Sequence, residues 1–296
     1  QFGSLARRRF RLDDMVAGVQ LIIWGLFKKV MIADHCGRIV DTVYGDGSAT
    51  PDGWAIIVAT YAFTLQIYCD FSAYSEIARG SARIFGVRLM QNFDQPYLTR
   101  SITDFWRRWH ISLSEWFRDY VYIPLGGSRR GKARTLFNLT LTMFVSGLWH
   151  GAAWNFVIWG LFHGLLLLTG TLLGMHTGYR KLRERSGVVG DLVAWAVTLH
   201  LVVFGWLMFR VDNLAQFTHF TRSAGSALAT VPTSVQLACL AAFFGFIACS
   251  AVERRLRLLT WVHASGARAL CFHALLIITM LLFGARGGPQ FIYFQF

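Results

Sequence analysis

Residues 104–131 read DFWRRWHISLSEWFRDYVYIPLGGSRRG, and residues 146–164 read SGLWHGAAWNFVIWGLFHG. Together they place two histidines, His110 and His150, among tryptophans in a chain otherwise rich in apolar residues. At about 100° per residue, the first stretch predicts one helix from Asp104 to the turn at Pro124, charged on one side and aromatic on the other, with His110 on the aromatic side. Such a helix belongs at a membrane interface or beside a wet cavity. The charged side would hold Asp104, Arg107, Arg108, Glu115, Arg118 and Asp119.

The second stretch predicts a short helix that ends at a histidine. Leu136–Trp149 is apolar but only about 14 residues long, whereas a membrane span needs about 20. We therefore expect this helix to stop inside the membrane. An ionisable group at that depth is costly, so His150 is a candidate functional residue, although it would also be explained by a hydrogen bond to a neighbouring helix. Glycines four residues apart allow helices to approach closely, and they are Gly147 with Gly151 and Gly160 with Gly164.

Composition places the chain in the membrane. Hydrophobic residues make up 54% of it, charged residues 15%, and the mean hydropathy is +0.43. The net charge of +13 comes from basic residues that alternate with apolar spans, which indicates membrane topology rather than nucleic-acid binding. The five cysteines show no paired spacing and predict neither disulfides nor a metal site. The sequence starts at Gln1 without an initiator Met, so we expect it to be the C-terminal part of a longer chain.

Basic residues also predict which segments face the cytoplasm. Residues 79–134 contain eleven Lys and Arg and should be cytoplasmic, whereas the acidic loop 41–53 should lie outside. Lys28 and Lys29 interrupt the first apolar run and would snorkel or line a cavity. The expected spans are 15–33, 54 to about 77, 154–173, 192–209, 235–252 and 269–284.

Asp70 lies within the second expected span, with Glu76 nearby. A carboxylate there is either catalytic or a structural partner of an arginine such as Arg79 or Arg83. The sequence contains no phosphate-binding glycine motif, no zinc-ligand spacing and no serine nucleophile elbow.

Taken together, these motifs resemble the membrane-bound O-acyltransferase (MBOAT) family, in particular its bacterial branch that acetylates alginate-type polysaccharides. Further matching segments are GLFKKVMIAD at 25–34, DFSAYSEIA at 70–78 and FIYFQF at 291–296. The resemblance implies an all-α, polytopic membrane bundle in which short or re-entrant and interfacial helices surround a central tunnel. Residues 1–296 would form one partial domain that lacks the N-terminal helices of the family.

The resemblance also implies roles for individual residues. His150 corresponds to the central histidine of the family, set in the tunnel, and would act as the catalytic base. His110 would be a second catalytic histidine, and because other branches carry Asn at this position, an orienting role suits it better than proton transfer. Trp149, His163 and Asp70 would line or support the tunnel.

By the same resemblance the acyl donor is acetyl-CoA or a similar thioester on the cytoplasmic side, with no other cofactor and no metal. Arg129, Arg130 and Lys132 would attract its phosphates, or else they only fix the topology of the loop. Residues 285–296 would form an extracytoplasmic aromatic tail, in which Tyr293 either carries the acyl group or anchors the tail at the interface.

The implied function is transfer of an acetyl group across the bacterial inner membrane for O-acetylation of an exported polysaccharide. Its expected partners are a periplasmic or secreted acyltransferase, the machinery of polysaccharide synthesis and the lipid bilayer, without nucleic acid. Two alternatives stay open. One is a D-alanyl transferase of teichoic acids, and the other is a non-catalytic lipid or polysaccharide conduit.

Overall fold

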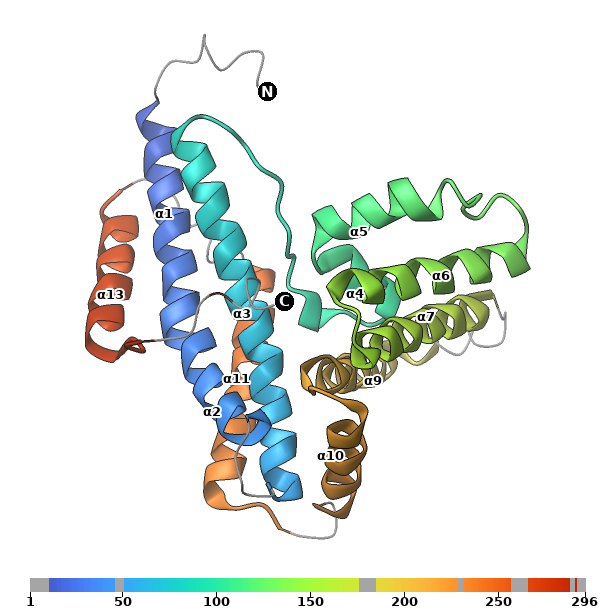
Figure 1. Cartoon of the computed structure of the whole chain (residues 1–296). Coiled ribbons are helices and arrows are strands. Elements are labelled where there is room, and N and C mark those ends of the chain that lie inside the picture. Colours follow the sequence, from blue (N-terminus) through green and yellow to red (C-terminus); the bar gives the residue numbers. More distant parts are fainter. Residues whose placement is uncertain are drawn as a thin grey trace. The chain divides into compact units, whose positions relative to one another are not determined.

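The computed structural model describes residues 11–45, 51–175, 185–227, 231–256, 266–287 and 291. Within these ranges the chain forms helices joined by turns, and it contains no β-strand (Figure 1). The predicted all-α class is therefore confirmed.

By length and composition, five helical stretches suffice to cross a membrane: Leu12–Tyr44, Gly53–Ile84, Trp154–Gly174, Gly187–Arg210 and Ser234–Arg255. A shorter apolar helix spans Ala267–Phe283. These stretches contain the apolar cores of the spans expected from hydropathy, and they make the chain a polytopic membrane protein.

The chain divides into two compact units. Unit 1 comprises residues 1–47, 61–92 and 234–296, and unit 2 comprises residues 48–60 and 93–233. Unit 1 contains α1 (Leu12–Lys28), a π-helical turn (Lys29–Ala33), α2 (Asp34–Tyr44), most of α3 (Gly53–Ile84), α11 (Ser234–Leu256) and α13 (Ala267–Phe283). Unit 2 contains a 3₁₀ turn (Pro96–Leu98), α4 (Ile102–Arg108), α5 (Ile111–Phe117), a π-helical turn (Arg118–Tyr122), α6 (Lys132–His150), α7 (Trp154–Met175), α9 (Gly187–Arg210) and α10 (Leu214–Ala227).

In unit 1, α1 packs closely against α3 because glycines remove side chains at their contact. A Cβ added to Gly18 would lie 2.6 Å from the carbonyl oxygen of Gly80, and one added to Gly25 would lie 2.8 Å from that of Ala73. Helix α13 also packs along α1 (Figure 1). Residues in such close backbone contact tolerate no larger side chain.

In unit 2, α6 and α7 lie side by side and are joined by the short segment 151–153 (Figure 1). The Asn155 side chain donates a hydrogen bond of 2.9 Å to the carbonyl oxygen of Val211 and so ties the start of α7 to the end of α9. The indole of Trp195, on α9, donates a bond of 2.9 Å to the carbonyl oxygen of Tyr97. These bonds hold α7, α9 and the segment before α4 as one packed group.

The helices differ from the sequence expectations at three places. Residues 210–232, between two expected spans, contain helix α10. Helix α6 ends at His150 as expected, but it begins at Lys132 and has 19 residues, so it extends beyond its apolar run of about 14. The single helix expected from Asp104 to Pro124 is broken at His110, because that residue adopts a left-handed backbone conformation.

Candidate active site

The break at His110 turns the chain between two short helices. Ser101 caps α4 by accepting a 3.1 Å hydrogen bond from the backbone N–H of Asp104. The helix ends at Arg108, and His110 follows with φ 43° and ψ 57°. The carbonyl oxygen of His110 then accepts the first hydrogen bond of α5, 2.9 Å from Ser114 N. This conformation is uncommon for a residue with a side chain, although His, Asn and Asp adopt it more often than most.

His110 is largely enclosed by protein. Its Nδ1 lies 3.5 Å from the hydroxyl oxygen of Ser112. Burial lowers the pKa of His110 to about 4, because the enclosed site disfavours the charged imidazolium. At neutral pH the ring is therefore uncharged, with one nitrogen able to donate and one able to accept a hydrogen bond.

His150 ends α6 inside a set of aromatic rings that three helices supply. Its ring centroid lies 4.8 Å from that of Trp149, 5.2 Å from Trp159 on α7 and 5.0 Å from Phe209 on α9. His150 is half-buried, whereas 46% of the Trp149 surface is exposed. The histidine site is therefore bordered on one side by an exposed tryptophan.

The two histidines come from different segments, the α4–α5 break and the end of α6. They lie within the range of electrostatic interaction, so that a positive charge on one ring would disfavour a positive charge on the other. The structure thus brings together the two residues that the sequence singled out in separate stretches. Two imidazoles in one site can divide the tasks of accepting a proton and orienting the group that loses it.

Glycines fix the position of His150 through the contact between α6 and α7. A Cβ added to Gly160 would lie 2.5 Å from the carbonyl oxygen of Met143, and one added to Gly164 would lie 3.1 Å from the Cα of Thr140. Gly147 likewise faces the backbone of α7. The predicted close approach of these helices is therefore present, and it fixes the position of His150 relative to α7.

His163 is more deeply buried than His150. Only 1% of its surface is exposed, and its ring centroid lies 5.2 Å from that of Trp106 and 5.0 Å from that of Trp159. Its Nδ1 has no hydrogen-bond partner within the described part of the chain. Trp159 contacts both His150 and His163, and it is a site residue that the sequence analysis did not single out. The sequence signal that could have identified Trp159 is its position in the run WNFVIWGLFHG.

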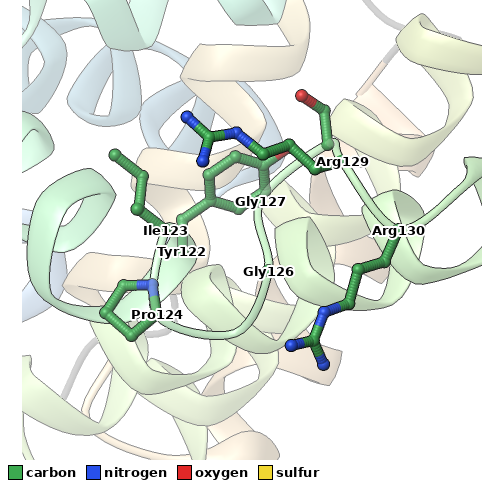
Figure 2. Close-up of a pocket in the computed structure, with 8 residues that line it drawn as sticks. Tyr122, Ile123, Pro124, Gly126, Gly127, Arg129 and Arg130 are labelled. Carbon is green, nitrogen blue, oxygen red and sulfur yellow. The ribbon is translucent and has the colours of Figure 1, made fainter.

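A second feature of unit 2 is a pocket in the loop before α6. It has a volume of about 400 Å³ and is lined by residues 122–124 and 126–130. The side chain of Asn138, on α6, holds the loop by donating to the carbonyl oxygens of Leu125 (3.3 Å) and Gly127 (3.0 Å). Figure 2 shows the side chains of Arg129 and Arg130 leaving the loop in different directions.

The charge of this loop is not neutralised within the described residues. Arg129, Arg130 and Lys132 are exposed, and none of them forms an ion pair in the described ranges. Lys132 is the first residue of α6, which has no acidic residue in its first turn and no side-chain cap. A basic helix start adds to the positive end of the helix dipole, so the loop favours an anion.

Asp70 lies in unit 1 and belongs to a different cluster. Its carboxylate is 2.6 Å from the ammonium of Lys29, which also lies 2.8 Å from the carboxylate of Asp34. Asp70 therefore pairs with a lysine, whereas the sequence had suggested either an arginine partner or a catalytic role, and Lys29 is buried rather than snorkelling. The neighbouring Lys28 is likewise buried and pairs with Glu76 at 2.7 Å. Lys29 and Asp34 were missed as site candidates although both lie in the motif at 25–34.

The last candidate, Tyr293, lies outside the described residues.

Comparison with known proteins gives the class of this fold and site. The model of the membrane-bound O-acyltransferase family matches residues 20–210. The chain therefore belongs to this family, and the matched range contains both histidines, the α6–α7 pair and the loop pocket.

Several curated relatives are similar to the chain. A probable alginate O-acetylase of Pseudomonas putida is 44% identical over 208 residues, which cover 70% of this chain and 41% of the relative. A peptidoglycan O-acetyltransferase of Helicobacter pylori is 36% identical, with 72% and 40% covered. A teichoic acid D-alanyltransferase of Streptococcus thermophilus is 35% identical, with 63% and 48% covered. The chain thus spans less than half the length of these relatives.

Proposed function

We propose that the full-length protein is an O-acyltransferase that moves an acetyl group from a cytoplasmic thioester, such as acetyl-CoA, towards an exported polysaccharide. The observation that carries this proposal is the position of His150 among aromatic rings of three helices, within electrostatic range of His110, in a member of this family. The alginate and peptidoglycan O-acetyltransferases among the relatives support acetyl as the group and a glycan as its destination.

The chemistry requires a base beside an incoming hydroxyl. The hydroxyl oxygen attacks the thioester carbonyl carbon, His150 accepts the hydroxyl proton, the C–S bond breaks, and the proton passes to the departing sulfur. His110 orients the hydroxyl or His150 through its ring nitrogens. The surrounding rings exclude water, so that the thioester is transferred rather than hydrolysed.

The loop pocket supports the choice of an anionic donor. Arg129 and Arg130 border a space of about 400 Å³ and form no ion pair in the described ranges, so their charge is available to the phosphates of a CoA-type thioester. This assignment places residues 79–134 on the cytoplasmic side of a bacterial inner membrane. The basic residues of this loop would also be explained if their only role were to fix the membrane topology.

On the other side of the membrane we propose a relay through the C-terminal tail. Tyr293 would accept the acetyl group on its phenolic oxygen and pass it to a periplasmic or secreted acyltransferase that works with the machinery of polysaccharide synthesis. The aromatic tail 291–296 and the need to deliver an acyl group beyond the membrane support this relay.

The second candidate is D-alanyl transfer to teichoic acids, which the 35% identity to a teichoic acid D-alanyltransferase favours. The two candidates share the base and the thioester and differ in the group transferred. Membranes containing the full-length protein, supplied in turn with labelled acetyl and D-alanyl thioesters, would distinguish them. A conduit without chemistry would release no free thiol in either case.

The experiment that tests the proposed chemistry is His150→Ala in the full-length protein. We expect polymer acetylation and thiol release to fall by about 10²- to 10⁴-fold, the usual contribution of a general base, while the protein still inserts into the membrane. His219→Ala is the matched control, because this exposed histidine of α10 lies outside the site. Acetylation at the wild-type rate in His150→Ala would refute the catalytic role.

A further inference from the structure

A buried ionic cluster in unit 1 contacts the C-terminal segment of the chain. Lys29 is 8% exposed, and its ammonium lies between carboxylates from two helices, Asp34 on α2 and Asp70 on α3. The ring of Phe291 lies over the same ammonium, 4.8 Å from Nζ to the ring centroid. Phe291 is far from Lys29 in sequence, so the fold returns the end of the chain to a buried charge.

Local helix geometry explains how Lys29 reaches both carboxylates. Lys29 opens the π-helical turn, in which the backbone N–H of Asp34 bonds to the carbonyl oxygen of Lys29. Residues five apart lie on different sides of an α-helix, but one π turn brings them to the same side. The π turn therefore lets Lys29 and Asp34 form an ion pair while Lys29 also meets Asp70. Single π turns of this kind are frequently found at functional sites.

The chain after α13 is fixed to the same place by further contacts. The backbone N–H of Ala285 donates a 3.1 Å bond to the carbonyl oxygen of Val30, inside the π turn. The guanidinium of Arg38 donates a 3.2 Å bond to the carbonyl oxygen of Arg286. Phe291 then packs edge-on against Tyr74 of α3, with ring centroids 5.7 Å apart. Three positions of the segment 285–291 thus contact α1–α2 and α3.

We propose that the Lys29–Asp34–Asp70 cluster is an intramolecular docking site for the C-terminal aromatic segment, and that the Phe291 ring on Lys29 is its anchor. Lys29 is a positioning residue here, since it holds the chain two residues before Tyr293. The two carboxylates keep the ammonium charged and aimed, and the ring adds a cation–π contact. Any role of this docking in acyl transfer rests on the relay proposed above. The docking itself does not depend on that relay.

The test uses the full-length protein with its native cysteines replaced and a reporter cysteine in place of Gln295. The measured quantity is the rate at which a maleimide labels that cysteine in detergent. Loss of the anchor in Phe291→Leu should speed labelling by about fivefold, the factor that corresponds to a cation–π contact of about 1 kcal/mol. Phe291→Trp keeps a ring over the ammonium and should label as slowly as the parent. Phe85→Leu is the matched control, because this phenylalanine is 77% exposed and follows the end of α3, fifteen residues beyond Asp70.

Fluorinated phenylalanines at position 291 make the test specific for the charge. Fluorine weakens the negative face of the ring but keeps its shape, so labelling should become faster with each added fluorine. In a Lys29→Met, Asp34→Asn background, which preserves the balance of charge, fluorination should have no effect. Equal labelling rates in the parent and in Phe291→Leu, or the same fluorine dependence without Lys29, would overturn the proposal.

The docking and the relay can fail separately. If Tyr293→Phe keeps normal acetylation while labelling still depends on Lys29 and Phe291, the docking site stands and the relay is wrong. If labelling does not depend on Phe291 but Tyr293→Phe abolishes acetylation, the relay stands and the docking proposal is overturned.

Discussion

His110 has a left-handed backbone, which costs about 1–3 kcal/mol for a residue with a side chain unless the surrounding structure holds it. Asn adopts this conformation more readily than most residues and keeps a donor and an acceptor. We therefore expect His110→Asn in the full-length protein to retain partial acetylation, and His110→Ala to lose most of it. The measurement is the initial rate of polymer acetylation at equal amounts of folded protein.

A glycine at the same position separates backbone from side chain. His110→Gly removes the cost of the left-handed conformation but supplies no polar group. If His110 orients the reaction, this variant should be as stable as wild type and nearly inactive. Complete loss of activity in the stable Asn variant as well would show instead that His110 transfers a proton itself.

The ion-pair partner of Asp70 could not be predicted from its position in the sequence. The sequence placed this carboxylate in a span and indicated either catalysis or an arginine partner. Its actual partner is Lys29, on another helix, and the π turn that aims Lys29 has no sequence marker comparable to a proline or glycine. Partners brought together by tertiary packing lie beyond what local spacing can predict.

Between elements, the tightest contact near the site is that of α6 with α7. In Gly160→Ala the new methyl group would lie 2.5 Å from the carbonyl oxygen of Met143, so one helix must shift. We expect a loss of stability of about 1–3 kcal/mol, the usual effect of overpacking, seen as a lower unfolding temperature in detergent. Activity should fall as well, since α6 carries His150.

The control for this substitution lies on the same helix. Gly170, on α7, has no atom within 4 Å of an added Cβ apart from its own helix and chain neighbours. Gly170→Ala should therefore leave the unfolding temperature unchanged or slightly higher. If both alanine variants behave alike, the close approach of α6 and α7 does not position the histidine.

Hydropathy and periodicity predicted the long elements better than the short ones. The expected span 154–173 is observed as Trp154–Met175, because about 20 apolar residues leave few alternatives in a membrane. The break at His110 was missed, since side-chain periodicity does not report backbone conformation. Helix α10 was missed because Leu214–Ala227 mixes polar and apolar residues without a long apolar run.

The loop before α6 allows a prediction about the donor. Replacing Arg129, Arg130 and Lys132 together by Gln should raise the KM for an anionic thioester several-fold and leave kcat nearly unchanged, because binding rather than chemistry is weakened. The difference from wild type should shrink at high salt, which screens exposed charges. Arg222→Gln, at a basic residue of α10 outside the loop, provides the control. If the KM is unchanged and the loop of the variant lies on the opposite side of the membrane, these residues serve only to fix the membrane topology.

At the scale of the whole molecule, the candidate functional residues are divided between the two compact units. The chain spans less than half the length of its curated relatives, yet unit 2 contains both histidines and the basic loop, and unit 1 contains the cluster that meets Phe291. The family and the overall class could be predicted from sequence because several separate motifs agreed. The docking of the C-terminal segment could not, because it depends on a buried lysine that the sequence analysis expected to snorkel or to line a cavity.

Tyr293 provides the test that joins the two sides of the membrane. If its hydroxyl carries the acetyl group, Tyr293→Phe in the full-length protein should abolish polymer acetylation while the protein folds normally, because only one oxygen is removed and the ring is kept. The wild-type protein, supplied with thioester in the absence of the glycan partner, should then carry an acetyl group on its C-terminal peptide, detectable by mass spectrometry.

A control with equal chemistry is Tyr120→Phe, which deletes the hydroxyl of an exposed tyrosine in the turn after α5 and should leave transfer unchanged. His150→Ala should leave the C-terminal peptide unmodified, because the base that activates the tyrosine hydroxyl is missing. This combination ties the modification to the site rather than to spontaneous acetylation. Normal polymer acetylation in Tyr293→Phe would eliminate the carrier role and leave the tail as an aromatic anchor at the membrane interface.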